Sequence, residues 1–253
     1  MIDTDSAALG AAWDRFASWL STHTPIDHAA LRPAASPEEI AGLETRLGFP
    51  LHPQLRALLE RHNGVVEIPE REYYAAGAFL PLGHRLNSTD QIARQHEMLK
   101  NIGFTEWGMW EEHELCGHAH RWVPFAHPND GGTAFVDHHP GPTYGHVYEM
   151  GIGSGDIDGV LWGASLAELF DRLATCLESG EPFQGWWPTP LELPSGHFCL
   201  DWDHDLFEEG ETLPEWPAPR RPVPPVRQAR PPAARPQGRL LGRGTVVPER
   251  PPS

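Results

Sequence analysis

The chain is poor in cysteine and has no long apolar run. Its three cysteines, Cys116, Cys176 and Cys199, stand far apart, without the paired spacing of a zinc ribbon or a disulfide framework. The first ten residues carry acids where a secretory signal peptide needs bases. No apolar run approaches the length of a membrane span. These absences predict a cytoplasmic protein in a reducing compartment, with no membrane partner.

Acidic and aromatic residues are nearly absent from residues 217–253. That segment holds eleven prolines and eight arginines, but only one acid and no aromatic ring. It cannot bury enough apolar surface to offset its ordering entropy, so disorder is predicted. Residues 1–216 therefore hold 34 of the 35 acids and 11 of the 19 bases, a net charge of −23 against −16 for the whole chain. Such a body repels nucleic acid and anionic membranes and favours a cationic partner, although the same charge can serve solubility alone.

The arginine-rich tail leaves three roles open. Its charge could hold nucleic acid or a membrane surface. Residues 222–225, Pro-Val-Pro-Pro, resemble a polyproline ligand. The tail could also touch its own acidic body, and this is the role that we favour.

Apolar spacing and capping residues predict five helices. Ser36 and Glu39 form the pattern of a capping box, and Ser165 caps a strongly amphipathic segment that Gly180 ends. The predicted helices cover residues 6–20, 36–47, 53–62, 87–102 and 165–179.

Short apolar runs between turn residues predict a small sheet. The runs lie at residues 65–66, 78–82, 122–125, 134–136, 147–148 and 160–162. Their turn-length links favour antiparallel pairing, and therefore the α+β class. Asn129–Gly132 and Pro140-Gly141 are predicted as hairpin turns. The side chains expected to point inward are Trp122, Phe125, Phe135 and Val147.

Sequence patterns for metal and phosphate binding fail at required positions. His96-Glu97 and His113-Glu114 lack the second histidine of a zincin helix. Asp201–Asp205 lacks the glycine and the bidentate glutamate of a calcium loop. Gly151–Gly155 lacks the third glycine and the lysine of phosphate loops. The fifteen histidines are expected mainly in solvated loops, and neither a cofactor nor a metal is expected.

Cys116, His118 and His120 leave one alternative of another class open. They alternate as if on one face of a strand, so they could offer ligands for a metal-dependent hydrolase. Structural zinc sites usually draw paired ligands from two places, and no second pair is evident. Solvated loop histidines are therefore the interpretation that we favour for this stretch.

One ordered series of motifs runs through most of the chain. The segment IAGLETRLGFPLHPQLRALLERHNG, residues 40–64, has a short helix with Glu44, then Leu-Gly, prolines, and a second helix that ends in Asn63-Gly64. Further matching pieces lie at residues 78–81, 122–126, 129–132, 137–147 and 165–170. In this order they resemble the SUKH superfamily, the Smi/Knr cell-wall-regulator-like domain, over about residues 36–180. Thr133 departs from the pattern, because an acid is frequent there, and residues 104–120 and those past Pro182 look particular to this chain.

The resemblance implies a protein-binding module and not an enzyme. Bacterial members often act as immunity proteins that block toxins used between competing bacteria, many of them basic nucleases or deaminases. Fungal members act as interaction hubs in cell-wall signalling. We therefore expect a toxin–antitoxin type of immunity protein with a cationic toxin as its partner. The alternative is a regulatory hub of the cell-wall-regulator type.

The expected fold is a single SUKH-like α+β domain. N-terminal helices pack on a small, mostly antiparallel sheet, and a C-terminal helix closes the domain. The expected segments are an N-terminal helix and linker (1–35), the SUKH domain (36–182), an acidic aromatic extension that packs over the core (183–216) and the tail (217–253). The expected binding face is acidic and bears tryptophans. Its expected residues are Trp107, Trp110, Asp130, Asp156, Asp158 and Trp202.

Overall fold

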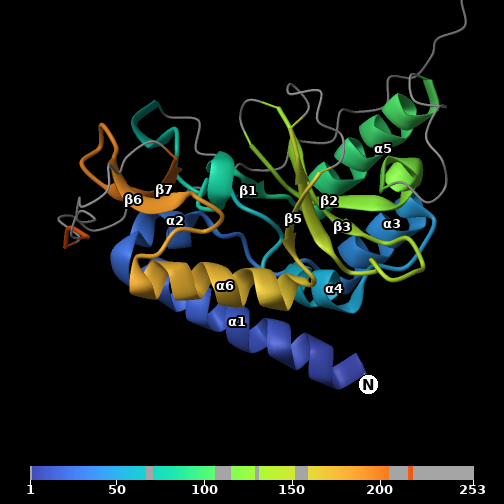
Figure 1. Ribbon diagram of the computed structural model, residues 1–253, viewed down its shortest axis with the longest axis horizontal. Helices are drawn as coiled ribbons and strands as arrows, with labels where there is room; N and C mark the ends of the chain where they lie inside the picture. The colour runs from blue at the N-terminus through green and yellow to red at the C-terminus, as the bar shows by residue number, and fades with distance from the viewer. Residues whose placement is uncertain are drawn as a thin grey trace, which may run out of the picture.

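The described part of the chain begins with helices, continues into strands that α5 and a 3-10 helix interrupt after the first strand, and then forms a helix and a hairpin (Figure 1). The computed structural model describes residues 2–66, 71–105, 115–128, 131–151, 159–204 and 216–218. The α-helices are α1 (Ile2–His23), α2 (Pro25–Ala30), α3 (Pro37–Leu47), α4 (Pro53–Leu59), α5 (Thr89–Thr105) and α6 (Leu166–Ser179). Three 3-10 helices are η1 (Arg71–Tyr73), η2 (Pro81–Gly83) and η3 (Leu115–Arg121).

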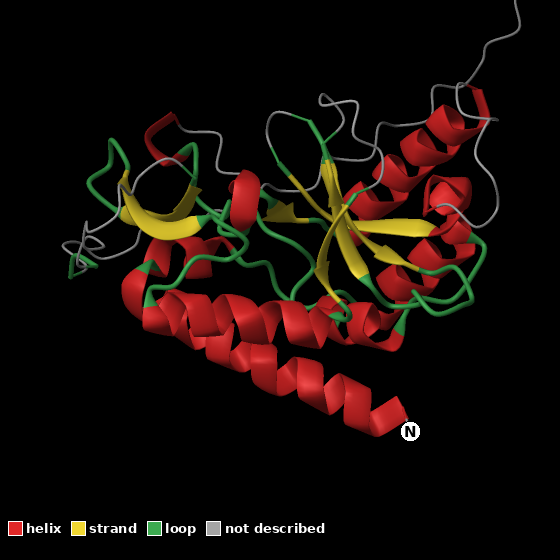
Figure 2. Ribbon diagram, viewed as in Figure 1, coloured by secondary structure: helices red, strands yellow, loops and turns green. Residues whose placement is uncertain are grey.

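Two antiparallel sheets stand apart in Figure 2. The larger sheet has the order β1-β2-β3-β4-β5, so each strand pairs with the next one along the chain. Its strands are β1 (Arg85–Leu86), β2 (Trp122–His127), β3 (Thr133–Asp137), β4 (Val147–Met150) and β5 (Val160–Gly163). The second sheet is a hairpin of β6 (Trp187–Glu192) and β7 (Phe198–Asp203). The expected α+β fold, with a mostly antiparallel sheet and a closing helix, is confirmed.

Helices cover both faces of the larger sheet. Phe125 and Val147 point into the main core, which contains α1 and α6 side chains. Trp122 and Phe135 point to the other face, where their rings stack at 4.2 Å and pack with Leu99 of α5. The four side chains predicted to point inward are all buried, but they are divided between two faces. Buried strands of this kind are apolar on both sides.

Local capping determines where the predicted helices begin and end. Ser36 Oγ accepts a hydrogen bond from the Glu39 amide at 3.2 Å, and Glu39 Oε2 accepts from the Ser36 amide at 2.7 Å. Ser165 Oγ likewise accepts from the Glu168 amide at 3.1 Å, at the start of α6. Gly180 ends α6 with a φ of 76°. The predicted capping box and the predicted α6 cap are confirmed.

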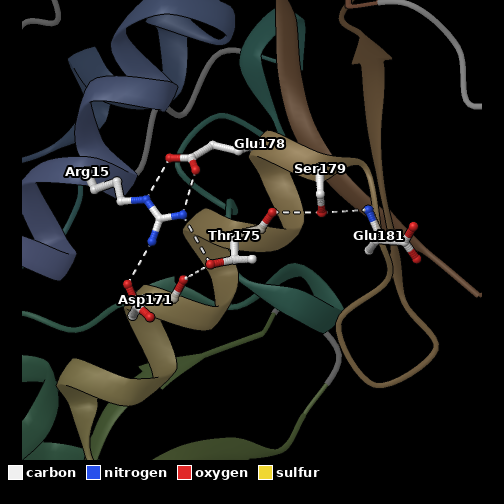
Figure 3. Close-up of polar contacts among 6 residues, drawn as sticks. All are labelled: Arg15, Asp171, Thr175, Glu178, Ser179 and Glu181. Carbon is white, nitrogen blue, oxygen red and sulfur yellow. Dashed lines mark hydrogen bonds and ion pairs between the residues drawn. The ribbon is translucent and has the colours of Figure 1, made fainter.

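Helix α1 lies along α6, and the two form the lower layer in Figure 1. Trp13 of α1 meets the Phe170 ring edge-on at 4.8 Å. At the rim, Arg15 donates to both Glu178 oxygens, at 2.7 and 2.5 Å, and to Asp171 Oδ1 at 2.7 Å (Figure 3). On the inner side, apolar residues of α1 belong to the same core as residues of the larger sheet and of β7.

A buried carboxylate joins α2 to the hairpin. Asp27 Oδ1 accepts a hydrogen bond from the Gly77 amide at 2.8 Å, and Oδ2 accepts from the Leu200 amide at 2.7 Å. The side chain is fully buried. Burial raises the pKa of Asp27 to about 7, while the two amides and the charge of Arg85 oppose that rise. One side chain thus ties three segments that are distant in sequence.

The strand predicted over residues 78–82 is wrong. Pro81–Gly83 forms η2, where Leu82 has a φ of 60°, and the strand β1 begins only at Arg85. Val65 makes an isolated bridge with Leu31 and belongs to no strand. The β6–β7 hairpin was not predicted, because Pro188 and Pro190 are unusual in strands. They are tolerated here in a two-stranded sheet, where every strand is an edge strand.

Candidate interaction surface

Five of the six residues expected on the binding face lie outside the described residues. They are Trp107, Trp110, Asp130, Asp156 and Asp158.

The sixth, Trp202, is a core residue, which corrects the prediction of a surface role. Its side chain is 3% exposed, and its Nε1–H donates to the Phe79 carbonyl at 3.0 Å. The β6–β7 hairpin turns this ring toward Phe183, at a centroid distance of 6.3 Å. No face of the ring is left for a partner.

The strand topology brings the acidic segments of the prediction to one end of the sheet. Thr133, at the start of β3, pairs with Met150, at the end of β4. Val160, at the start of β5, pairs with Glu149, next to Met150. The segment that carries Asp130 joins β2 to β3, and the segment with Asp156 and Asp158 joins β4 to β5. Both segments therefore leave the sheet from the same end, called the loop end below and defined by Gly131, Gly132, Met150, Gly151, Gly159 and Val160.

Close backbone packing and exposed apolar side chains characterise the loop end. Gly132 has a φ of 109°, and a Cβ there would lie 2.9 Å from the Met150 carbonyl oxygen, so only glycine fits. The side chain of Leu115, the first residue of η3, lies beside Gly159. Val160 is 50% exposed and its neighbour Leu161 is 45% exposed. The described part of the loop end thus combines close backbone packing with exposed apolar side chains.

The opposite end of the sheet holds a cluster of histidines. His138 follows β3, and its Nδ1–H donates to the Val136 carbonyl at 2.9 Å while its Nε2 accepts from the His52 amide at 2.8 Å. Burial lowers the pKa of His138 to about 3. His96 is also buried, and its Nε2 lies 3.0 Å from the His120 carbonyl oxygen. The expectation of solvated loop histidines is wrong for these side chains, since each fills space between packed elements.

The strand-face arrangement expected for Cys116, His118 and His120 is also wrong. These residues lie in η3, whose period of three residues differs from the two-residue alternation of a strand. His118 is buried and stacks on His139 at 3.5 Å, whereas His120 is exposed. Among the side chains that the structure describes, no group of three or more His, Cys, Asp or Glu is placed to hold a metal ion.

None of the helices in the described ranges combines the length and the apolar character that a membrane crossing needs.

Comparison with known families adds to this geometry. A model of the SMI1 / KNR4 family (SUKH-1) matches residues 34–172, which is more than half of the chain. The chain belongs to this family. A comparison with curated proteins finds no match. The SUKH-1 match starts three residues before α3 and ends within α6, so it spans the whole larger sheet.

The first SUKH-1 motif builds the joint between α3 and α4. Glu44 Oε1 accepts from the Leu51 amide at 2.8 Å and from Arg56 Nη2 at 2.5 Å. Gly48 ends α3 with a φ of 82°. The glutamate thus holds the start of one helix against the end of the other.

The Asn63-Gly64 pair of the SUKH-1 domain ties α4 to the start of α5. Asn63 Oδ1 accepts from the Thr89 amide at 2.8 Å. Gly64 has a φ of 74°, and a Cβ there would lie 2.5 Å from the Ser88 backbone nitrogen. Such an approach is open to glycine alone.

Asp137 orders the turn between β3 and β4 in the same way. Its Oδ1 accepts from the His139 amide at 2.8 Å, and its Oδ2 accepts from Thr143 Oγ1 at 2.7 Å. These motif residues all have structural tasks.

Sequence reasoning did not predict that β5 would form an exposed edge of the sheet. It predicted a strand over residues 160–162, but not its position in the sheet. The two adjacent apolar residues Val160 and Leu161, directly after a glycine-rich segment, are the only local signal. Strand order depends on pairings that sequence alone does not reveal.

Proposed function

We propose that this SUKH-1 protein is a non-catalytic, cytoplasmic binding module of the immunity type, which neutralises a basic protein toxin by covering it. The observation that carries the proposal is the charge of residues 1–216, a net −23. An acidic surface speeds the capture of a cationic protein and rejects partners of like charge. Membership of the SUKH-1 family supports a binding role.

The loop end is the surface that we assign to this role. In the sequence, Asp130 lies between β2 and β3, and Asp156 and Asp158 lie between β4 and β5, shortly before the exposed Val160 and Leu161. Apolar contact surrounded by charge is the usual arrangement of a specific interface. The motif residues at the α3–α4 joint and at the β3–β4 turn are engaged in the scaffold.

Co-expression with the toxin candidate encoded by the neighbouring gene tests the proposal. We expect rescue of growth and recovery of the two proteins as a complex. No complex and no rescue would contradict the immunity role.

A matched pair of variants locates the surface. Asp130, Asp156 and Asp158 are changed to asparagine in one protein, and in the control the exposed Glu38, Glu60 and Glu72 are changed to glutamine. Both variants lose three negative charges. The first should lower affinity about tenfold or more, whereas the control should change it only about twofold.

A regulatory hub is the second candidate, and the composition of residues 217–253 favours it. Eleven prolines and eight arginines could present an extended basic ligand to a partner. Deletion of residues 219–253 decides between the two roles. A hub should lose its partner, whereas an immunity protein that works through its acidic body should keep its toxin.

A further inference from the structure

Strand β5 is an edge of the larger sheet. It pairs with β4 on one side, and no other strand in the described part of the chain pairs with it. Its first two residues, Val160 and Leu161, are 50% and 45% exposed. Exposed apolar edges promote pairing with another chain, and proteins usually protect them.

The backbone of β5 shows how this edge is covered. Trp162 is an extra residue in the β4–β5 register, and its carbonyl accepts from Arg172 Nη1 at 3.0 Å. The Leu161 carbonyl accepts from Gln184 Nε2 at 2.7 Å, in place of a strand neighbour.

The covering residue is itself held in an unfavourable conformation. Gln184 is exposed and has a φ of 52°, in the left-handed region that favours glycine. Its side chain replaces a neighbouring strand at a single carbonyl. A partner strand would replace this bond and the Arg172–Trp162 bond by backbone hydrogen bonds, and it would also cover both apolar side chains.

We propose that β5 is a docking edge, to which the cationic partner adds an extended segment with alternating apolar and basic residues. This inference rests on the proposed function. In the sequence, Asp156 and Asp158 precede β5, and Glu168 follows it as the ion-pair partner of Arg172. The same acids disfavour a second copy of this chain, because each copy carries a net charge of −16.

A short peptide tests the docking edge on the full-length protein. The probe is an acetylated and amidated peptide of four Lys-Val repeats, with fluorescence anisotropy for affinity and amide NMR shifts for location. Binding should shift the amides of residues 160–163. A peptide of four Glu-Val repeats should not bind. A Lys-Val peptide with alternate N-methylated backbone nitrogens keeps the charge but cannot pair, so it should lose most of the affinity.

One variant separates strand addition from attraction by charge. Gln184→Gly suits the φ of 52° and uncovers the Leu161 carbonyl. We expect the affinity for the Lys-Val peptide to rise about three- to tenfold, because the peptide no longer displaces a hydrogen bond. Unmoved amides at residues 160–163, or equal binding of the N-methylated peptide, would overturn the docking edge. A doubled mass of Gln184→Gly in light scattering would also overturn it, since a second copy would then be the occupant.

The toxin complex distinguishes the two proposals. Toxin binding without shifts in the amides of β5 would reject the docking edge and leave the proposed function standing. Absence of toxin binding, together with peptide-induced shifts in β5, would reject the proposed toxin while keeping the edge as a strand acceptor.

Discussion

His138 and Asp27 are both buried. A lower pH should reduce the contribution of His138 to stability and increase that of Asp27. Both side chains hold together segments that are distant in sequence. Burial disfavours the charged form of each group, so the pKa falls for the histidine and rises for the carboxyl. A pKa that differs between the folded and unfolded states makes stability depend on pH.

His138 should destabilise the fold in acid. Its pKa is about 3 in the folded state against 6.5 for an ordinary histidine, so the unfolded chain binds the extra proton. Its contribution to stability is therefore lost as pH falls from 6.5 toward 3. We expect His138→Gln to cost about 1–3 kcal/mol at pH 7.5, because its hydrogen bonds are lost, and to lose less stability on acidification. Urea unfolding from pH 7.5 to 4.5 measures both, and equal pH slopes in the two proteins would refute this role.

Asp27 should act in the opposite direction. Its folded pKa of about 7 lies above the ordinary 3.8, so the folded state binds the extra proton. The resulting stability is complete below pH 3.8 and is lost as pH rises through 7. Asp27→Asn offers one acceptor oxygen to two amide donors, which should cost about 1–3 kcal/mol at pH 5. The difference in unfolding free energy from the wild type should narrow between pH 5 and 8, and a widening difference would contradict the assigned pKa.

Gly64 and Gly48 form a matched pair for testing the SUKH-1 motif. Both have positive φ, but a Cβ on Gly64 would meet backbone atoms at 2.5 and 2.6 Å, whereas a Cβ on Gly48 meets nothing within 4 Å. Gly48→Ala should cost about 1 kcal/mol from backbone strain alone. Gly64→Ala should cost about 3 kcal/mol or more, because strain and a clash with backbone add. Thermal and chemical unfolding compare them, and equal costs would show that the contact at Gly64 is unimportant.

At the scale of elements, two kinds of contact hold α1 against α6, which are buried apolar packing and ion pairs at the surface. Trp13 is buried against Phe170, whereas Arg15 makes its hydrogen bonds at an exposed rim. Trp13→Ala should cost about 3–5 kcal/mol through the cavity that it leaves. Arg15→Ala should cost about 1 kcal/mol or less, since exposed ion pairs contribute little. Urea unfolding measures the free energy that each variant loses. A larger loss in Arg15→Ala than in Trp13→Ala would mean that the ionic network holds α1.

The elements also show which predictions depend on local chemistry. The start and the end of α3 were predicted correctly, because the Ser36–Glu39 capping box and the C-terminal Gly48 each act within the one helix. Residues 78–82 were apolar enough for a strand, but Leu82 takes a left-handed conformation in η2. The β6–β7 hairpin contradicts ordinary strand composition, and the Asp27 carboxylate holds it through the Leu200 amide. No local sequence pattern predicts a contact between residues that are so far apart in the chain.

At the scale of the whole molecule, the two charge blocks should oppose each other. Changing the eight arginines of residues 217–253 to glutamine takes the formal net charge from −16 to −24. We expect faster association with fluorescent polylysine at low ionic strength, because the acidic body is no longer neutralised by its own tail. The difference should vanish at about 0.5 M salt, where screening is strong. Stopped-flow fluorescence measures the rates. In the control, eight tail prolines are changed to alanine, which makes the same number of substitutions and leaves the net charge at −16. An unchanged rate in the arginine variant would show that the tail does not compete.

The amino-acid sequence alone determined the α+β class, the main helices and four strands of the larger sheet, because caps, turns and periodicity act over a few residues. The order of its motifs also indicated the family. Only the tertiary structure showed that His138 is buried and that Val160 and Leu161 are exposed on an edge strand whose carbonyls bond to side chains. Burial and strand order depend on contacts between residues far apart in the chain. Whether such a side chain lies on the surface or in the core therefore depends on how those distant segments pack together.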